Sequence, residues 1–191
     1  MGRVNEEGEL TGPDLAYLFP DLATALVGTF RRGELVTGQA ATLLSLRLDY
    51  GAVKVPLFTP GEGPLLGKEI STSDTITSLP LVPDPYELAT VEVRQSSVPF
   101  AEEGLFARRA VPPDTVLAFY NGVRYIRPAD APQTWQNEAN AYKIFDPSCK
   151  DGVFNIPAKF HSTANYCASL AHKTNHSFVP NCEFGEFQHP R

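Results

Sequence analysis

The apolar positions along the chain fall into short runs, several of which alternate with polar residues as half-buried β-strands do. No window shows the spacing of a capped amphipathic helix, and the most helix-like stretch, residues 161–172, has poor apolar spacing. The 17 prolines and 14 glycines also disfavour helix interiors. We therefore predict a mostly β fold of short strands and tight turns. The predicted strands are residues 15–19, 25–30, 90–94, 115–120 and 153–156, the fourth closed by a turn at Asn121-Gly122.

Glycines recur at similar positions in the first part of the chain. Gly8-Glu-Leu-Thr-Gly12 returns as Gly33-Glu-Leu-Val-Thr-Gly38 with one residue inserted, and a further glycine, Gly2 or Gly28, precedes each copy. Because glycine adopts positive φ without steric cost, this spacing predicts successive hairpins with the glycines in turns. We interpret 1–50 as a β-hairpin region, 51–87 as an irregular connecting segment with one or two short strands, and 88–191 as a second domain.

Composition and charge exclude several classes of protein. Of the 191 residues, 42% are hydrophobic and 20% charged, which is typical of globular proteins rather than disordered ones. The formal net charge of −6 argues against direct binding to nucleic acid and suits a Lys/Arg-rich peptide. No run approaches the roughly 20 apolar residues of a membrane helix. The three cysteines form no C-x-x-C pair, which disfavours a disulfide scaffold or a zinc site.

Three segments in the second half carry recognisable chemistry: Ala101-Glu-Glu-Gly-Leu-Phe106, Tyr120-Asn-Gly122 and Asn175-His-Ser-Phe-Val-Pro-Asn-Cys182. The last is the most specific, because its order of residues is hard to reach by composition alone. Together they resemble the SET-domain protein lysine methyltransferases. Within these, the chain resembles the branch with N-terminal MORN repeats that monomethylates a lysine of the histone H3 tail and lysines of other proteins. The glycine repeat and the segments 81–87 and 166–177 extend this resemblance through nearly the whole chain.

The resemblance implies MORN-like β-hairpins followed by a SET-type β fold with short helices. It also implies that S-adenosylmethionine, the co-substrate, and the target lysine enter from opposite faces and meet in a narrow channel, without a metal. Ala101, Glu102 and Glu103 would present backbone groups to the methionine portion of the cofactor. Asn175 and His176 would bind it as well, with their backbone at the adenine.

The resemblance also assigns residues to the substrate lysine. Tyr120 would be the catalytic tyrosine, with its hydroxyl directed at the lysine nitrogen, and Asn140 matches a family asparagine near the cofactor and the amine. Phe184 stands where this branch has an active-site tyrosine. Loss of that hydroxyl removes a hydrogen bond that restrains the amine, so we expect a protein more permissive for dimethylation.

The sequence stops at His189-Pro-Arg191. In the family, a Glu-rich strand, a further catalytic tyrosine and an aromatic helix follow, and this segment helps to close the lysine channel. The SET region is therefore interpreted as incomplete, and we expect this chain alone to be a poor methyltransferase.

The resemblance implies that the partners are the histone H3 tail and other lysine-bearing proteins. It also implies a monomer in the nucleus, on the chromosome, with some cytoplasmic protein. The same residues also allow interpretations that involve no methyl transfer. Asn175-His-Ser matches a glycosylation sequon, Glu102 and Glu103 could form a solvated turn, and Tyr120 could be a core aromatic. The alternative function is a non-catalytic module that uses MORN-like and SET-derived surfaces to bind protein partners or lipid headgroups.

Overall fold

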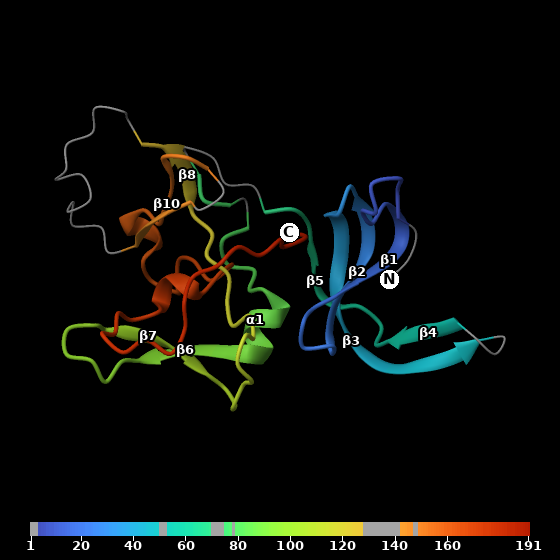
Figure 1. Cartoon of the computed structure of the whole chain (residues 1–191), viewed down its shortest axis with the longest axis horizontal. Helices are drawn as coiled ribbons and strands as arrows, with labels where there is room; N and C mark the ends of the chain where they lie inside the picture. Colours follow the sequence, from blue (N-terminus) through green and yellow to red (C-terminus); the bar gives the residue numbers. More distant parts are fainter. Residues whose placement is uncertain (1–3, 50–52, 70–74, 78, 128–141, 147–148) are drawn as a thin grey trace. The chain divides into compact units, whose positions relative to one another are not determined.

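The computed structural model describes residues 4–49, 53–69, 75–77, 79–127, 142–146 and 149–191 (Figure 1). The chain is mostly β, as predicted, and it divides into two compact units. Unit 1 comprises residues 1–68, 112–116 and 188–191. Unit 2 comprises residues 69–111 and 117–187. Each unit is therefore assembled from segments that lie apart in the sequence.

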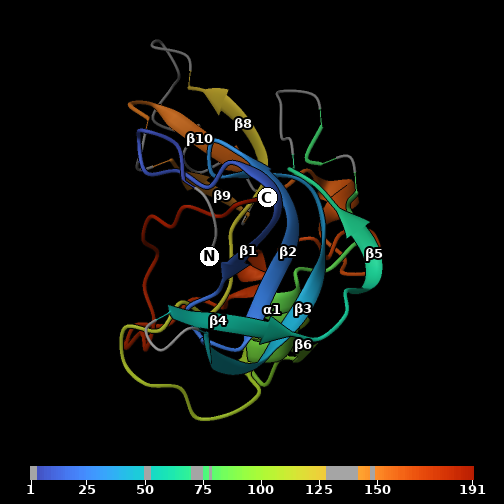
Figure 2. The ribbon, with the colours of Figure 1, turned by 90° about the vertical axis from the view of Figure 1, so that its right-hand side faces the viewer.

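Unit 1 is one antiparallel sheet of five strands, with bounds β1 Gly12–Leu18, β2 Thr24–Arg31, β3 Glu34–Asp49, β4 Val53–Phe58 and β5 Glu62–Leu66. The strands pair in the order β1-β2-β3-β4, and β5 also pairs with β3. Figure 2 shows β1, β2 and β3 running side by side. The predicted strands at 15–19 and 25–30 are confirmed as β1 and β2. The long β3 contains the most apolar run of the sequence, and β4 and β5 are the short strands predicted within the connecting segment.

The glycines of the repeat serve two different purposes. Gly8 and Gly33 have φ of 84° and 79°, so they occupy turns as predicted. The prediction is wrong for Gly28 and Gly38, which lie inside β2 and β3 as cross-strand partners. A Cβ atom on Gly28 would lie 2.2 Å from the carbonyl oxygen of Thr37. These glycines therefore permit close approach of two strands rather than positive φ.

The last residues of the described chain complete unit 1. The carbonyl oxygen of Pro190 accepts a hydrogen bond from the N–H of Leu35 at 2.7 Å. The ring of His189 lies 5.4 Å from that of Phe19. Leu35 and Phe19 are both 0% exposed, so this segment covers the core of the sheet.

Unit 2 contains two small antiparallel sheets and short helical turns. One sheet is the hairpin β6–β7, and β6 confirms the strand predicted at 90–94. The other sheet has the strand order β8-β10-β9, and β10 confirms the strand predicted at 153–156. The single α-helix among the described residues, α1, was not predicted. The bounds are α1 Pro85–Thr90, β6 Val91–Gln95, β7 Glu103–Ala107, β8 Val123–Ile126, β9 Lys143–Phe145, β10 Gly152–Asn155, and the 3-10 turns η2 Ala158–Phe160 and η3 Ala171–Lys173.

Helix α1 forms because its first turn is capped. Asp84 adopts extended backbone geometry, and its Oδ1 accepts hydrogen bonds from the N–H groups of Tyr86 at 2.9 Å and Glu87 at 3.2 Å. Pro85 follows at the first helical position, where its missing N–H costs nothing. The Asp-Pro pair was a start signal, although six residues are too few for apolar periodicity to reveal a helix.

One further sequence interpretation is corrected. Residues 115–120 form no strand, because the N–H of Phe119 bonds to the Glu87 carboxylate and that of Asn121 to the Ser169 hydroxyl, instead of to a neighbouring strand. The stretch 161–172, whose poor apolar spacing did not predict a helix, forms turns and the start of η3.

The core of unit 2 underlies the segment that ends in Tyr120. Tyr166 and Ile156 are 0% exposed and pack together with three further buried residues, Ile76, Val123 and Ala168. The side chains of Tyr120 and Tyr142 pack against this cluster from its edge, where they are only partly buried. The cluster thus supplies a rigid base for both tyrosines.

Candidate functional site

Tyr120 points its hydroxyl at the backbone of Tyr142. The O–H donates a hydrogen bond to the Tyr142 carbonyl oxygen at 2.6 Å, which holds the phenol in one orientation. Burial, and secondarily the neighbouring Tyr142, raises the pKa of Tyr120 above its ordinary value, so the phenol stays protonated at neutral pH. The ring of Phe184 stands edge-on to the Tyr120 ring, with the centroids 5.8 Å apart. The structure thus brings together two of the three residues assigned to the substrate lysine.

Aromatic and imidazole rings surround Tyr142. The ring of His161 lies 4.3 Å from it and that of His172 lies 5.7 Å away, measured between centroids. His172 is only 4% exposed and also contacts Tyr166. Burial, followed by the charge of Lys173, lowers the pKa of His172 to about 4, so this imidazole is neutral at physiological pH.

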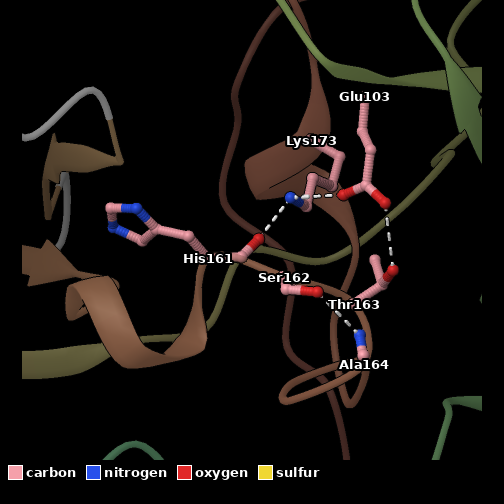
Figure 3. Close-up of polar contacts among 6 residues, drawn as sticks. All are labelled: Glu103, His161, Ser162, Thr163, Ala164 and Lys173. Carbon is pink, nitrogen blue, oxygen red and sulfur yellow. Dashed lines mark hydrogen bonds and ion pairs between the residues drawn. The ribbon is translucent and has the colours of Figure 1, made fainter.

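A buried ammonium ties the start of β7 to η3 (Figure 3). The Nζ of Lys173 lies 2.7 Å from Oε2 of Glu103 and also donates to the carbonyl oxygen of His161. The Lys173 side chain is 4% exposed, whereas that of Glu103 is 36% exposed. The hydroxyl of Thr163 donates to the other Glu103 oxygen at 3.3 Å. The side chain of Glu103 is therefore engaged within the protein.

The loop before β7 has an unusual backbone. Phe100 and Glu102 have φ of 65° and 36°, in the left-handed region that non-glycine residues rarely occupy. The N–H of Ala101 donates to the carbonyl oxygen of Val98 at 3.2 Å, and the Glu102 side chain is exposed. Strained backbone of this kind, on an exposed loop, is typical of ligand-binding segments.

Asn175 lies beside the same hairpin. Its Nδ2 donates to the Ser96 hydroxyl at 2.8 Å, and a Cβ atom on Gly104 would lie 2.7 Å from that nitrogen. Glycine in β7 therefore lets Asn175 pack against the strand. His176 is exposed, with its ring edge-on to Phe178 at 5.1 Å.

The predicted cofactor residues thus gather around one hairpin. Ala101, Glu102 and Glu103 form its turn and the start of β7, and Asn175 packs against the hairpin, with His176 following directly. Asn140 lies outside the described residues. Lys173 was missed, because a lysine is usually a surface charge and its burial becomes visible only in the fold.

Several other polar groups of the site were also missed. His172 contacts Tyr142, and Glu87 bonds to the backbone of Phe119. The sequence does not reveal these tertiary contacts, nor the bond from the Tyr120 hydroxyl to the Tyr142 carbonyl oxygen. Among the described residues, no group of three or more His, Cys, Asp or Glu side chains could hold a metal ion. Within the same residues, no helix has the length and apolar character needed to cross a bilayer.

Comparison with known proteins identifies the lineage. Residues 1–50 match the family model described as the N-terminal region of the histone H3 K4-specific methyltransferase SET7. The whole chain is 39% identical, over 192 aligned positions, to the histone-lysine N-methyltransferase SETD7 of Halocynthia roretzi. The chain is therefore similar, along its whole length, to SET7-type lysine methyltransferases. It spans 49% of the length of that relative.

The similarity to SET7-type proteins can be placed on the architecture described above. The region matched by the family model covers β1, β2 and all of β3, so the glycine repeat lies within the part of the chain that matches the SET7 N-terminal model. The alignment with the relative continues through the hairpin β6–β7 and the segment that carries Asn175. The similarity therefore extends over both units.

Proposed function

We propose that this chain derives from the protein lysine N-methyltransferases that use S-adenosylmethionine as co-substrate and act on a lysine of the histone H3 tail and of other proteins. The observation that carries the proposal is the alignment of the whole chain with a histone-lysine methyltransferase. The oriented, partly buried hydroxyl of Tyr120 supports it. Nuclear residence on chromatin follows from the same lineage.

The hairpin β6–β7 is suited to the cofactor. The Glu103 side chain is engaged by Lys173 and Thr163. The Ala101 N–H and the Glu102 carbonyl oxygen bond within the hairpin, so the Ala101 carbonyl oxygen and the Glu102 N–H are the backbone groups of this turn that would face a ligand. Asn175 is anchored by its side chain to Ser96, so its backbone is likewise the part available. This arrangement agrees with the backbone contacts that the family resemblance implies. S-adenosylmethionine, when bound, supplies a methyl group on a sulfonium.

The chemistry requires an uncharged amine, which the aromatic surroundings of Tyr120 favour. Deprotonating a lysine of pKa about 10.4 at neutral pH costs roughly 4–5 kcal/mol. Desolvation beside Tyr120, Tyr142 and Phe184 lowers that cost, because it disfavours the ammonium form. The fixed Tyr120 hydroxyl then orients the nitrogen, and alignment supplies most of the remaining rate enhancement.

Calorimetry with S-adenosylmethionine tests the proposal directly. We expect the chain to bind the cofactor, and His176→Ala and Asn175→Ala to weaken binding at least tenfold. Asn165→Ala is the matched control, because the side chain of this exposed asparagine of unit 2 has one described hydrogen bond, to the carbonyl oxygen of Lys159. Absence of cofactor binding, together with binding to lipid vesicles or protein partners, would support the non-catalytic alternative.

A further inference from the structure

A buried carboxylate at the end of the segment 81–87 holds the backbone next to Tyr120. Glu87 is 0% exposed, and its Oε1 accepts hydrogen bonds from the N–H of Phe119 at 2.7 Å and of Leu170 at 2.9 Å. Phe119 immediately precedes Tyr120, and Leu170 immediately precedes η3, which carries His172 and Lys173. One oxygen atom therefore joins two segments that are about fifty residues apart in the sequence.

Other bonds join the same two segments around Tyr120. The N–H of Ala171 donates to the Phe119 carbonyl oxygen at 3.1 Å. On the other side of Tyr120, the N–H of Asn121 donates to the Ser169 hydroxyl at 3.1 Å. Both backbone neighbours of Tyr120 are thus held by the segment that leads into η3. Glu87 is the only charged group among the described partners of these bonds.

The position of Glu87 is fixed by its own element. The Asp84 cap holds the Glu87 N–H at the start of α1, and the ring of the preceding Tyr86 lies 5.7 Å from that of Phe119. A carboxylate suits this place because it accepts several hydrogen bonds, and charge-assisted bonds are shorter and stronger than neutral ones. Burying a carboxylate is unfavourable unless such partners compensate, so a purely apolar packing role would not select glutamate here.

We propose that Glu87 is a positioning residue that sets the backbone of Tyr120 against the η3 turn, and with it the direction of the Tyr120 hydroxyl. The catalytic meaning of this role rests on the proposed function of Tyr120. The geometric role does not, and it can be measured without any methyl transfer.

Nuclear magnetic resonance of the full chain tests the geometric role. Glu87→Gln keeps one acceptor oxygen, so we expect the amide proton signals of Phe119 and Leu170 to move upfield while the Tyr120 ring signals stay in place. Glu87→Met has no acceptor, so we expect hydrogen exchange of both amides to rise at least tenfold and the Tyr120 Cζ signal to shift. Should Glu87→Met fail to fold, Glu87→Asp, which is shorter by one methylene, takes its place.

Glu92→Gln is the matched control, because Glu92 lies in the same unit and its described partners are the side chains of Arg94 and Arg108 rather than backbone amides. It should change neither the two amides nor Tyr120. A Glu87→Met or Glu87→Asp protein that is less stable but retains wild-type Tyr120 signals would overturn the proposal, because that result indicates a merely structural carboxylate.

Kinetics then separate this inference from the proposed function. For methyl transfer to a lysine peptide, we expect Glu87→Met to lower kcat at least tenfold, Glu87→Gln to stay within about threefold of wild type, and KM for S-adenosylmethionine to change little. If the wild-type chain transfers no methyl group but the resonance changes occur, the positioning role stands and the proposed function fails. If transfer occurs and all Glu87 variants match wild type in both measurements, the positioning role fails.

Discussion

At the scale of single residues, the buried imidazole of His172 makes stability depend on pH. Burial and the neighbouring Lys173 lower its pKa to about 4, against about 6.5 in an unfolded chain, whereas Glu103 and the Ser169 backbone partly oppose this shift and His161 adds to it. At a pH between these two pKa values, His172 is protonated in the unfolded state but neutral in the folded state. The free energy of unfolding should therefore fall as the pH drops from about 6.5 to about 4, by at most about 3 kcal/mol from this group.

Urea unfolding of wild type and His172→Gln across this pH range measures the effect. The variant lacks the titrating group, so its stability should decline less steeply than that of wild type as the solution is acidified. Parallel curves for the two proteins would contradict the prediction, since they would assign the whole pH dependence to carboxylates and other histidines.

Phe184 is the second residue with a measurable consequence. Its ring lies edge-on to Tyr120 but carries no hydroxyl, so it offers the amine no hydrogen bond. In any form of the protein that transfers methyl groups, we expect wild type to yield dimethyllysine and Phe184→Tyr to yield mostly monomethyllysine. Mass spectrometry of the modified peptide distinguishes the products, and a strictly monomethylated product from wild type would refute the expectation.

At the scale of the elements, the ion pair between β7 and η3 should respond unequally to loss of its two partners. Without Lys173, the Glu103 carboxylate is 36% exposed and keeps the Thr163 hydroxyl, so Lys173→Met should cost about 1 kcal/mol or less. Without Glu103, an ammonium that is 4% exposed retains only the His161 carbonyl among its described hydrogen-bond partners, so Glu103→Met should cost about 3 kcal/mol or more.

The double variant Glu103→Met/Lys173→Met completes this test in urea unfolding. It removes the buried charge together with its partner, so it should be more stable than Glu103→Met alone. Equal losses for the two single variants, or no recovery in the double variant, would show that the ammonium is better solvated than its burial indicates.

The elements also show what sequence patterns could and could not predict. The pattern of apolar and β-branched residues found four strands, at 15–19, 25–30, 90–94 and 153–156. Burial does not alternate strictly along them, since neighbouring residues such as Leu15 and Ala16 are both buried. The residue pattern failed at 115–120, where it is similar but the amides bond to the Glu87 and Ser169 side chains. Hydrogen bonds to side chains from distant segments leave no local signal.

The same contrast holds for the candidate site. The motif residues were selected from family resemblance, and the structure brings Ala101, Glu103 and Asn175 to one hairpin. Lys173, which pairs with Glu103, and Glu87, which bonds to the backbone beside Tyr120, look like ordinary surface charges in the sequence. Only tertiary burial distinguishes them, because both are nearly or fully enclosed and hydrogen-bonded in the fold.

At the scale of the whole molecule, neither compact unit is a continuous stretch of chain. Unit 1 includes residues 188–191 beside its first 68 residues, and unit 2 is interrupted by 112–116. The N–H of the fully buried Leu35 donates to the Pro190 carbonyl, and His189 covers Phe19. An N-terminal piece that ends at residue 68 therefore lacks part of its own core.

Deletion of residues 188–191 should accordingly weaken the sheet at the opposite end of the sequence. It leaves the Leu35 N–H buried without its acceptor and uncovers the Phe19 ring, which together should lower the free energy of unfolding of unit 1 by about 1–3 kcal/mol. Hydrogen exchange followed by mass spectrometry resolves this by region: peptides from β2 and β3 should exchange faster, whereas those from β8 and β10 should not.

Gln188→Ala, at an exposed position, is the control and should leave both regions unchanged. Uniformly faster exchange in both sheets would instead mean that the chain unfolds as one cooperative body, while unchanged β3 peptides would mean that the last residues contribute nothing to the N-terminal core.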